Sequence, residues 1–317
     1  MKQSKQKQKN SLFNTGFSNR TENEGNRLLN KDGSFNVRKT GLQFIERFNL
    51  FHWLIKMSWL RFFIFMFIGY ILINLAFATL YFLAGIEGLS GDHSDSIADQ
   101  FLDAFYFSTQ TLTTVGYGYY SPIGEFHSLL ASFESFIGLM SFAMATGLLY
   151  GKFSKPKSGI IYSENVLISP YRGEGKGLMI RIANAKDNQL INLSATLIIS
   201  WINISQQGNA RKYYFLKLEM SKVNLLATSW TLVHPIDEES PIYGMTIDDL
   251  KSKDVEIIVQ LQGYDESYSQ EIHSRTSYKS EDIIWGAKFI SIMAHERDQS
   301  ILKLGELDLY ELTEFEN

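Results

Sequence analysis

The chain has 317 residues, of which 45% are hydrophobic, and it carries a net charge of −4 and no cysteine. The lack of cysteine excludes disulfides, thiolate metal sites and cysteine nucleophiles, and the near-balanced charge favours no nucleic-acid partner. The charges are unevenly placed, because Phe62 to Gly151 contains no Lys or Arg and the flanking segments hold all 30.

The first residues are polar. Residues 1–42 are rich in Lys, Asn, Gln and Ser, and we predict a disordered basic cytoplasmic tail near an anionic membrane surface. A tail that only solubilises the chain explains this composition equally well. The opening MKQSKQKQKN has no apolar stretch and is not a secretory signal.

Residues 43–57 alternate apolar and polar side chains at helical spacing. Phe44, Phe48 and Phe51 fall on one stripe, which predicts an amphipathic helix lying in the membrane interface. The alternative is a core helix of a soluble domain, but no such domain precedes it.

Two apolar segments follow within residues 58–153, which we predict to be a transmembrane pore domain. Phe62 to Leu83 is almost unbroken and would measure about 33 Å as a helix, enough to span a bilayer core. Phe126 to Tyr150 is less hydrophobic because it contains small and polar residues, as expected of a helix that faces water on one side. It also contains Glu134, whose carboxylate should be paired or lie near the pore because a lone lipid-facing charge is costly.

The charges beside these segments predict the topology. The loop from Ala84 to Asp99 is acidic and contains no base, whereas basic residues lie at the other ends of both segments. By the positive-inside rule, both termini are cytoplasmic. The same bases are candidate ligands for anionic lipid headgroups, each worth roughly 1 kcal/mol, although marking the topology is their other explanation. They are Lys56, Arg61, Lys152, Lys155 and Lys157.

Between the apolar segments, Thr114, Val115, Gly116, Tyr117 and Gly118 spell TVGYG, the loop known from potassium-channel selectivity filters. A dehydrated cation needs several oxygen ligands, and glycines that tolerate positive φ let successive carbonyls face one axis. The valine and tyrosine side chains are then free to pack outward, and the threonine hydroxyl can serve as the innermost ligand. One chain supplies a quarter of each ring, so we expect a homotetramer that holds K⁺ and needs no other cofactor.

The surroundings of this loop support the interpretation. Residues 96–113 are predicted to form a short helix, with Ser96 and Asp99 spaced as a capping pair, and its C-terminal dipole would favour a cation. A chance Gly-Tyr turn in a β protein would not lie between two apolar segments.

The rest of the chain changes character. Residues 159–317 show strand-like alternation broken by turns, which predicts a cytoplasmic antiparallel β-sandwich of immunoglobulin-like type without its disulfide. One short helix is predicted at Ile247 to Lys253, capped by Thr246. Residues 154–158 form the linker. The predicted fold class is thus a membrane α-helical two-span pore module plus an all-β sandwich.

Taken together, these segments resemble the bacterial inward-rectifier potassium channels. The match covers about positions 43 to 290 and is carried by NLFHWLIKMSWLRFF (49–63), TTVGYGYYSPIGE (113–125), GKFSKPK (151–157), LMIRIANAKDN (178–188), SWTLVHPIDEESPIYGMT (229–246) and LQGYDESYSQEIHSRTSY (261–278). The resemblance implies a homotetramer in the bacterial inner membrane, with a slide helix at the interface and a cytoplasmic vestibule. Its implied activity is passive K⁺ transport, modulated by anionic or phosphoinositide lipids.

The resemblance also places pore-lining residues. Phe142, Thr146, Tyr150 and Phe153 become the pore-facing stripe, and their spacing of i, i+4, i+8 and i+11 fits one helix face. Tyr150 is the first candidate gate and Phe153 the second, with a bend at a nearby glycine, Gly138 or Gly147. A lipid-facing Tyr150 is the alternative.

Two departures from the family pattern have consequences. Strong rectifiers have an acidic residue where this chain has Phe142, so weak rectification is expected. Gln110 and Tyr120 replace an ion pair behind the filter, which must then be braced by hydrogen bonds or packing.

Other functions fit the sequence less well. A nucleotide-gated channel would need a glycine-rich phosphate loop, and a voltage sensor would need an Arg-rich span. No catalytic constellation points to an enzyme. A membrane-anchored β-sandwich adaptor or sensor without conduction remains the alternative from another class.

Overall fold

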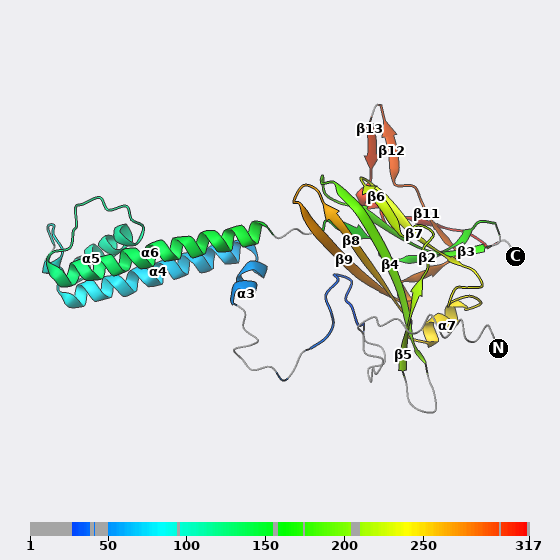
Figure 1. The fold of residues 1–317 in the computed structure, drawn as a ribbon, viewed down its shortest axis with the longest axis horizontal. Helices are drawn as coiled ribbons and strands as arrows, with labels where there is room; N and C mark the ends of the chain where they lie inside the picture. Colours follow the sequence, from blue (N-terminus) through cyan, green and yellow to red (C-terminus); the bar gives the residue numbers. More distant parts are fainter. Residues whose placement is uncertain are drawn as a thin grey trace. The chain divides into compact units, whose positions relative to one another are not determined.

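A computed structural model of the chain describes residues 27–38, 41, 50–93, 96–154, 158–173, 175–203, 210–297 and 299–315. The chain forms two compact units. One spans Thr40–Lys155 and is helical, and the other combines Pro156–Asn317 with Met1–Lys39 and is built from strands (Figure 1). The boundary between them falls inside the predicted linker, residues 154–158.

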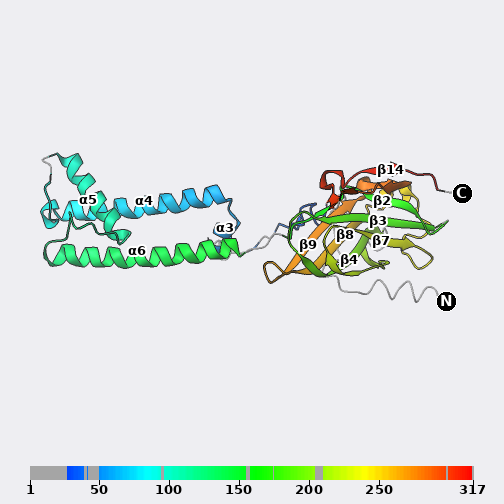
Figure 2. The ribbon, with the colours of Figure 1, turned by 90° about the horizontal axis from the view of Figure 1, so that it is seen from above.

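The helical unit contains four α-helices among the residues described. They are α3 (Leu50–Lys56), α4 (Trp59–Ala84), α5 (Ile97–Leu112) and α6 (Gly124–Phe153). Helices α4 and α6 lie side by side, with α5 at one end and α3 at the other (Figures 1 and 2). Both long helices are long and apolar enough to cross a membrane, which confirms the two predicted segments. Of the predicted interfacial helix, residues 43–49 lie outside the described part.

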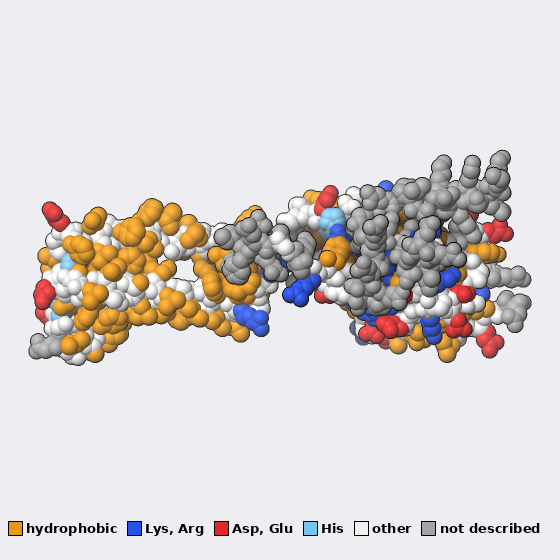
Figure 3. All heavy atoms as spheres, turned by 90° about the horizontal axis from the view of Figure 1, so that it is seen from below, with side chains coloured by type: hydrophobic (Ala, Val, Ile, Leu, Met, Phe, Trp, Pro, Cys, Tyr) orange, Lys and Arg blue, Asp and Glu red, His pale blue; other side chains and the backbone are white. Residues whose placement is uncertain are grey.

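Among the described residues, the main buried apolar cluster of the helical unit lies where α5 joins the long helices. Phe77 and Tyr81 of α4 pack there against Ala104 and Phe107 of α5 and Ala131 of α6. Along the rest of α4 and α6, large apolar side chains point outward, and Figure 3 shows hydrophobic side chains covering much of the visible face of these helices. Such a surface suits contact with lipid or with other copies of the chain.

The strand unit is a sandwich of two five-stranded sheets. The first has the order β1 (Ile160–Tyr162), β3 (Gly175–Asn184), β2 (Val166–Tyr171) and β10 (Ile283–Trp285), with β7 (Ser229–Ile236) also paired to β3. The second has the order β5 (Ala210–Leu216), β4 (Leu190–Asn203), β8 (Glu256–Asp265) and β9 (Gln270–Lys279), with β6 (Lys222–Leu226) also paired to β4. The predicted sandwich is confirmed, except that β2 and β10 run parallel where a purely antiparallel arrangement was predicted.

Smaller elements complete this unit. Strand β11 (Ala287–Phe289) pairs with β14 (Tyr310–Leu312), and β12 (Met293–Glu296) pairs with β13 (Gln299–Leu302). The predicted short helix is present as α7 (Ile247–Ser252). Thr246 and Asp249 form the predicted capping box at its start.

The second sheet is buried on its inner face and over one patch of its outer face. Residues 197 and 199 of β4 and 257 and 259 of β8 lie in the core between the sheets. Because side chains alternate along a strand, Ile198 and Ile258 face the opposite way, yet they are buried as well, together with Leu29. Residues 27–38 thus pack on the strand unit, and the predicted disordered tail, residues 1–42, is wrong for them. Residues 1–26, 39–40 and 42 lie outside the described part.

Candidate functional site

The backbone of the candidate filter alternates in handedness. Thr114, Gly116 and Gly118 have φ angles of 60°, 54° and 84°, whereas Val115 and Tyr117 between them keep negative φ. In a regular strand successive carbonyls point to opposite sides, and a change of handedness at every second residue can turn them to one side. The positive φ predicted for Gly116 and Gly118 is confirmed, and their role in holding K⁺ stays a prediction. Positive φ at Thr114 was not foreseen, because a β-branched residue rarely adopts it.

The inner half of this segment is held by the end of α5. The backbone N–H groups of Val115 and Gly116 donate to the carbonyl oxygen of Gln110 at 2.9 and 3.3 Å, and the N–H of Thr114 donates to that of Thr111 at 3.1 Å. The last carbonyls of a helix lack intrahelical partners, so they are free to accept these bonds. The helix C-terminus, predicted to face the filter, therefore both fixes the strained backbone and places the negative end of its dipole there.

The outer half is held by side chains. The Tyr120 hydroxyl donates to Asp103 of α5 at 2.8 Å, and the His93 ring stacks on Tyr120 with 5.7 Å between centroids. Burial, and then the bond to Asp103, raises the pKa of Tyr120 to about 12, so the phenol stays a donor at neutral pH. The predicted replacement of an ion pair by hydrogen bonding and packing is confirmed. Asp103 and His93 themselves were missed, although a carboxylate beyond the first turn of a partly apolar helix was a usable signal.

A second polar cluster joins the three helices behind the filter. Glu134 of α6 is fully buried, and its carboxylate accepts hydrogen bonds from Ser108 of α5 at 2.5 Å and from Tyr81 of α4 at 2.8 Å. The Ser108 hydroxyl also lies 3.1 Å from the side-chain oxygen of Asn74. The prediction that Glu134 is paired is therefore confirmed, and its partners tie α5 to both long helices.

Gly138 allows α6 to pass close to α5. A Cβ atom at this position would lie 2.1 Å from the carbonyl oxygen of Leu112, the last residue of α5. Helix α6 runs unbroken through Gly138 and Gly147, and a bend at one of them stays a prediction. Gly138 thus has a packing role of its own.

The predicted pore-lining residues all lie exposed on α6 in the single chain: Phe142, Thr146, Tyr150 and Phe153. The Thr146 hydroxyl donates to the Phe142 carbonyl at 2.9 Å, and the Phe153 ring lies 4.6 Å from that of Trp59 at the start of α4. An apolar hollow of about 810 Å³ extends beside Phe142 to Thr114 at the inner end of the candidate filter. The stripe and the filter segment are thus connected within one chain.

One of the predicted lipid-binding residues is engaged elsewhere. The Lys152 side chain is only 9% exposed, and its ammonium donates to the carbonyl oxygens of Ile55, at 3.2 Å, and Met57 at the end of α3. It also lies over the rings of Trp59 and Phe62. Free carbonyls at a helix end attract a cation. We predicted that Lys152 would present its charge to a lipid headgroup, but in the structure its side chain joins α3 to α6 instead.

The other predicted lipid ligands differ in what the structure describes. Lys56 and Arg61 are exposed, and Figure 3 shows basic side chains at one end of the helices and acidic ones at the other. Lys155 and Lys157 lie outside the described residues.

Comparison with known proteins gives the family. Residues 160–308 match the family described as "Inward rectifier potassium channel C-terminal domain", and residues 69–155 match the family described as "Ion channel". The chain is 35% identical over 272 residues to "Inward rectifier potassium channel Kirbac3.1" of Paramagnetospirillum magnetotacticum, covering 84% of this chain and 89% of that protein.

Eukaryotic relatives are more distant. "Inward rectifier potassium channel 4" of Mesocricetus auratus and that of Homo sapiens are each 28% identical over 212 residues, covering 62% of this chain and 46% of theirs. All these relatives are ion channels rather than enzymes. A pore module of two apolar helices, an all-β unit and this degree of identity place the chain in the inward rectifier potassium channel family.

Proposed function

We propose that four copies of this chain form a K⁺-selective channel in the bacterial inner membrane, with both termini cytoplasmic. Potassium ions pass through rings of backbone oxygen contributed by Thr114 to Gly118. The observation that carries the proposal is the alternating handedness of these residues beside the C-terminus of α5, since it can align the carbonyls without help from side chains.

A homotetramer is proposed because one chain supplies only one side of the path. The Val115 and Tyr117 side chains are 52% and 81% exposed in the single chain, although both are large and apolar or aromatic. Neighbouring copies around a fourfold axis would cover them and complete the rings. Residues 43–57 would then act as the interfacial helix and 58–153 as the pore.

The filter is tested by Gly116→Ala. No atom lies within 4 Å of a Cβ built at this position, but its φ of +54° is unfavourable for alanine, so the change tests backbone handedness rather than crowding. We expect barium-sensitive K⁺ flux from liposomes to fall at least about tenfold while the oligomer stays intact. A wild-type channel that passes Na⁺ as readily as K⁺ would contradict the filter.

We propose Tyr150 as the gate, with Phe153 as the second constriction. Four exposed tyrosines near the end of α6 can close a narrow pore by excluding water. Tyr150→Ala should raise K⁺ flux, and Tyr150→Phe, which keeps the bulk, should not. Equal flux in wild type and Tyr150→Ala would favour a lipid-facing side chain instead.

Anionic lipid is the proposed regulator, acting on the exposed Lys56 and Arg61 and on Lys155 and Lys157, each worth roughly 1 kcal/mol near a charged surface. Weak rectification is proposed because strong rectification depends on cationic polyamines that block the pore at an acidic side chain, and Phe142 at this position is uncharged.

A further inference from the structure

Residues 27–38 cover one patch on the outer face of the second sheet. Leu29 is fully buried there, in contact with Ile198 of β4, Tyr213 of β5 and Ile258 of β8. Without this cover, the three sheet residues would form an exposed apolar patch, because they face away from the core between the sheets.

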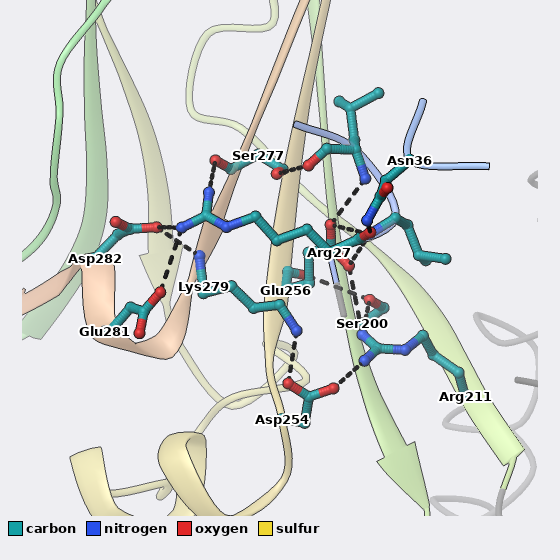
Figure 4. Close-up of polar contacts among 12 residues, drawn as sticks. Arg27, Asn36, Ser200, Arg211, Asp254, Glu256, Ser277, Lys279, Glu281 and Asp282 are labelled. Atoms are coloured by element: carbon teal, nitrogen blue, oxygen red, sulfur yellow. Dashed lines mark hydrogen bonds and ion pairs between the residues drawn. The ribbon is translucent and has the colours of Figure 1, made fainter. Parts of the chain in front are cut away.

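A buried carboxylate anchors the backbone of the segment. Glu256 of β8 is fully buried, and it accepts hydrogen bonds from the backbone N–H groups of Leu28 at 3.0 Å and Leu29 at 3.2 Å (Figure 4). On the sheet, Arg211 lies 3.7 Å from the same carboxylate and donates to Ser200 at 3.0 Å. Hydrogen bonds to a charged group are the strong ones, so the site recognises an extended backbone as well as a leucine.

The charges of the segment and the sheet are complementary. Arg27 pairs with Asp282 at 2.7 Å and donates to the Ser277 carbonyl at 3.2 Å (Figure 4). Lys31 pairs with the other oxygen of Asp282 at 2.9 Å. The sheet side offers the cations Arg211 and Lys279 against three carboxylates, those of Asp254, Glu256 and Asp282. Two of the three cations of the segment, Arg27 and Lys31, therefore pair with an acidic surface.

The tip of the segment is fitted closely to β9. Gly33 has a φ of +80° in a tight turn, closed by a bond from the Asn30 N–H to the Ser34 carbonyl at 2.8 Å. A Cβ atom on Gly33 would lie 2.6 Å from the carbonyl oxygen of Arg275. Only glycine meets both requirements, so the turn is shaped for this surface.

We propose that this outer face is a docking site for residues 27–38 of the chain, and that its occupancy restrains opening of the channel. Only the eleven residues 39–49 separate the docked segment from α3, a reach of at most about 40 Å. Helix α3 is in turn joined to α6 through Lys152. Docking therefore limits how far α3 can move and opposes separation of the α6 helices of the proposed tetramer. Release of residues 27–38 from the sheet removes that limit.

Docking is tested by thiol labelling, which the cysteine-free chain makes specific. Leu29→Cys and Val37→Cys place one thiol each on the same segment, at a buried position and at a position that is 62% exposed. In the full-length channel we expect labelling at position 29 to be at least about tenfold slower, and Glu256→Ala to remove the protection. Equal rates at the two positions would overturn the docking site.

The restraint is tested by K⁺ flux from liposomes and rests on the proposed function. Leu29→Asp puts a charge into the apolar pocket, and Val37→Asp is the matched control. We expect at least about twofold higher flux for Leu29→Asp and wild-type flux for the control, with equal tetramer content. Unchanged or lower flux for Leu29→Asp would overturn the restraint. A wild-type channel that fails to conduct would instead defeat the proposed function, and thiol labelling would still decide the docking.

Discussion

The two units of the chain are stabilised in different ways. The strand unit buries a large core between its sheets and covers a second apolar patch with its own N-terminal segment. The helical unit has a small core around α5, and elsewhere exposes residues such as Phe67, Leu83 and Tyr150. The first unit thus contains its own stabilising contacts, whereas the second exposes apolar side chains that suit contact with lipid or with the neighbouring copies of the proposed tetramer.

The largest expected effect is on assembly, and it comes from the close contact between Gly138 of α6 and Leu112 of α5. Gly138→Val puts a side chain against the backbone of Leu112, and because backbone cannot move aside easily, α5 should lose its place beside α6. We expect loss of the assembled channel, measured as tetramer yield by size-exclusion chromatography. Gly147→Ala, on the same helix with no atom within 4 Å, is the control and should assemble normally. Normal assembly of Gly138→Val would contradict the close contact.

A core truncation in the strand unit should act differently. Ile257 is fully buried between the sheets, so Ile257→Ala should lower the free energy of unfolding by about 2–5 kcal/mol. The measurement is denaturant unfolding of the full chain, and at moderate temperature the tetramer should persist. Leu225→Ala, at a position that is 55% exposed, should change little. Dissociation of the helical unit by Ile257→Ala would show that the two units are not stabilised separately.

The smallest effect concerns the outer half of the filter. Tyr120→Phe removes the bond to Asp103 but keeps the ring stacked on His93, so K⁺ over Na⁺ selectivity should fall severalfold, consistent with the roughly 0.5–1.5 kcal/mol net contribution of one hydrogen bond. Asp103→Asn keeps an acceptor for the phenol and should cost less. Permeability ratios from reversal potentials give the comparison. An equal or larger loss for Asp103→Asn would mean that charge, not the hydrogen bond, braces the filter.

Local patterns made much of the fold predictable. Two apolar runs, one glycine-bearing loop and the strand-like alternation of residues 159–317 predicted both long helices, the filter segment and the β-sandwich. Each depends on residues close together in sequence. The capped helix α7 was predictable for the same reason, since Thr246 and Asp249 are three positions apart.

Contacts between distant residues were not predictable in this way. The polar composition of residues 27–38 indicates disorder, and only the sheet reveals why Leu29 is ordered. A signal did exist, because β4 and β8 contain apolar residues at consecutive positions such as 197–199 and 257–259, typical of strands covered on both faces. The brace at Tyr120 also joins segments that the sequence alone cannot bring together.

Lys152 differs from Lys56 and Arg61 in how its charge is held, since it is buried between helices whereas they are exposed. Its charge counts toward topology, yet its ammonium is buried against carbonyl oxygens and aromatic rings, where dissolved ions screen little. Lys56 and Arg61 are exposed, and the attraction to an anionic leaflet that we propose for them would weaken as ionic strength rises. Salt concentration alone should therefore loosen α3 from the lipid surface while leaving its mechanical link to α6 in place.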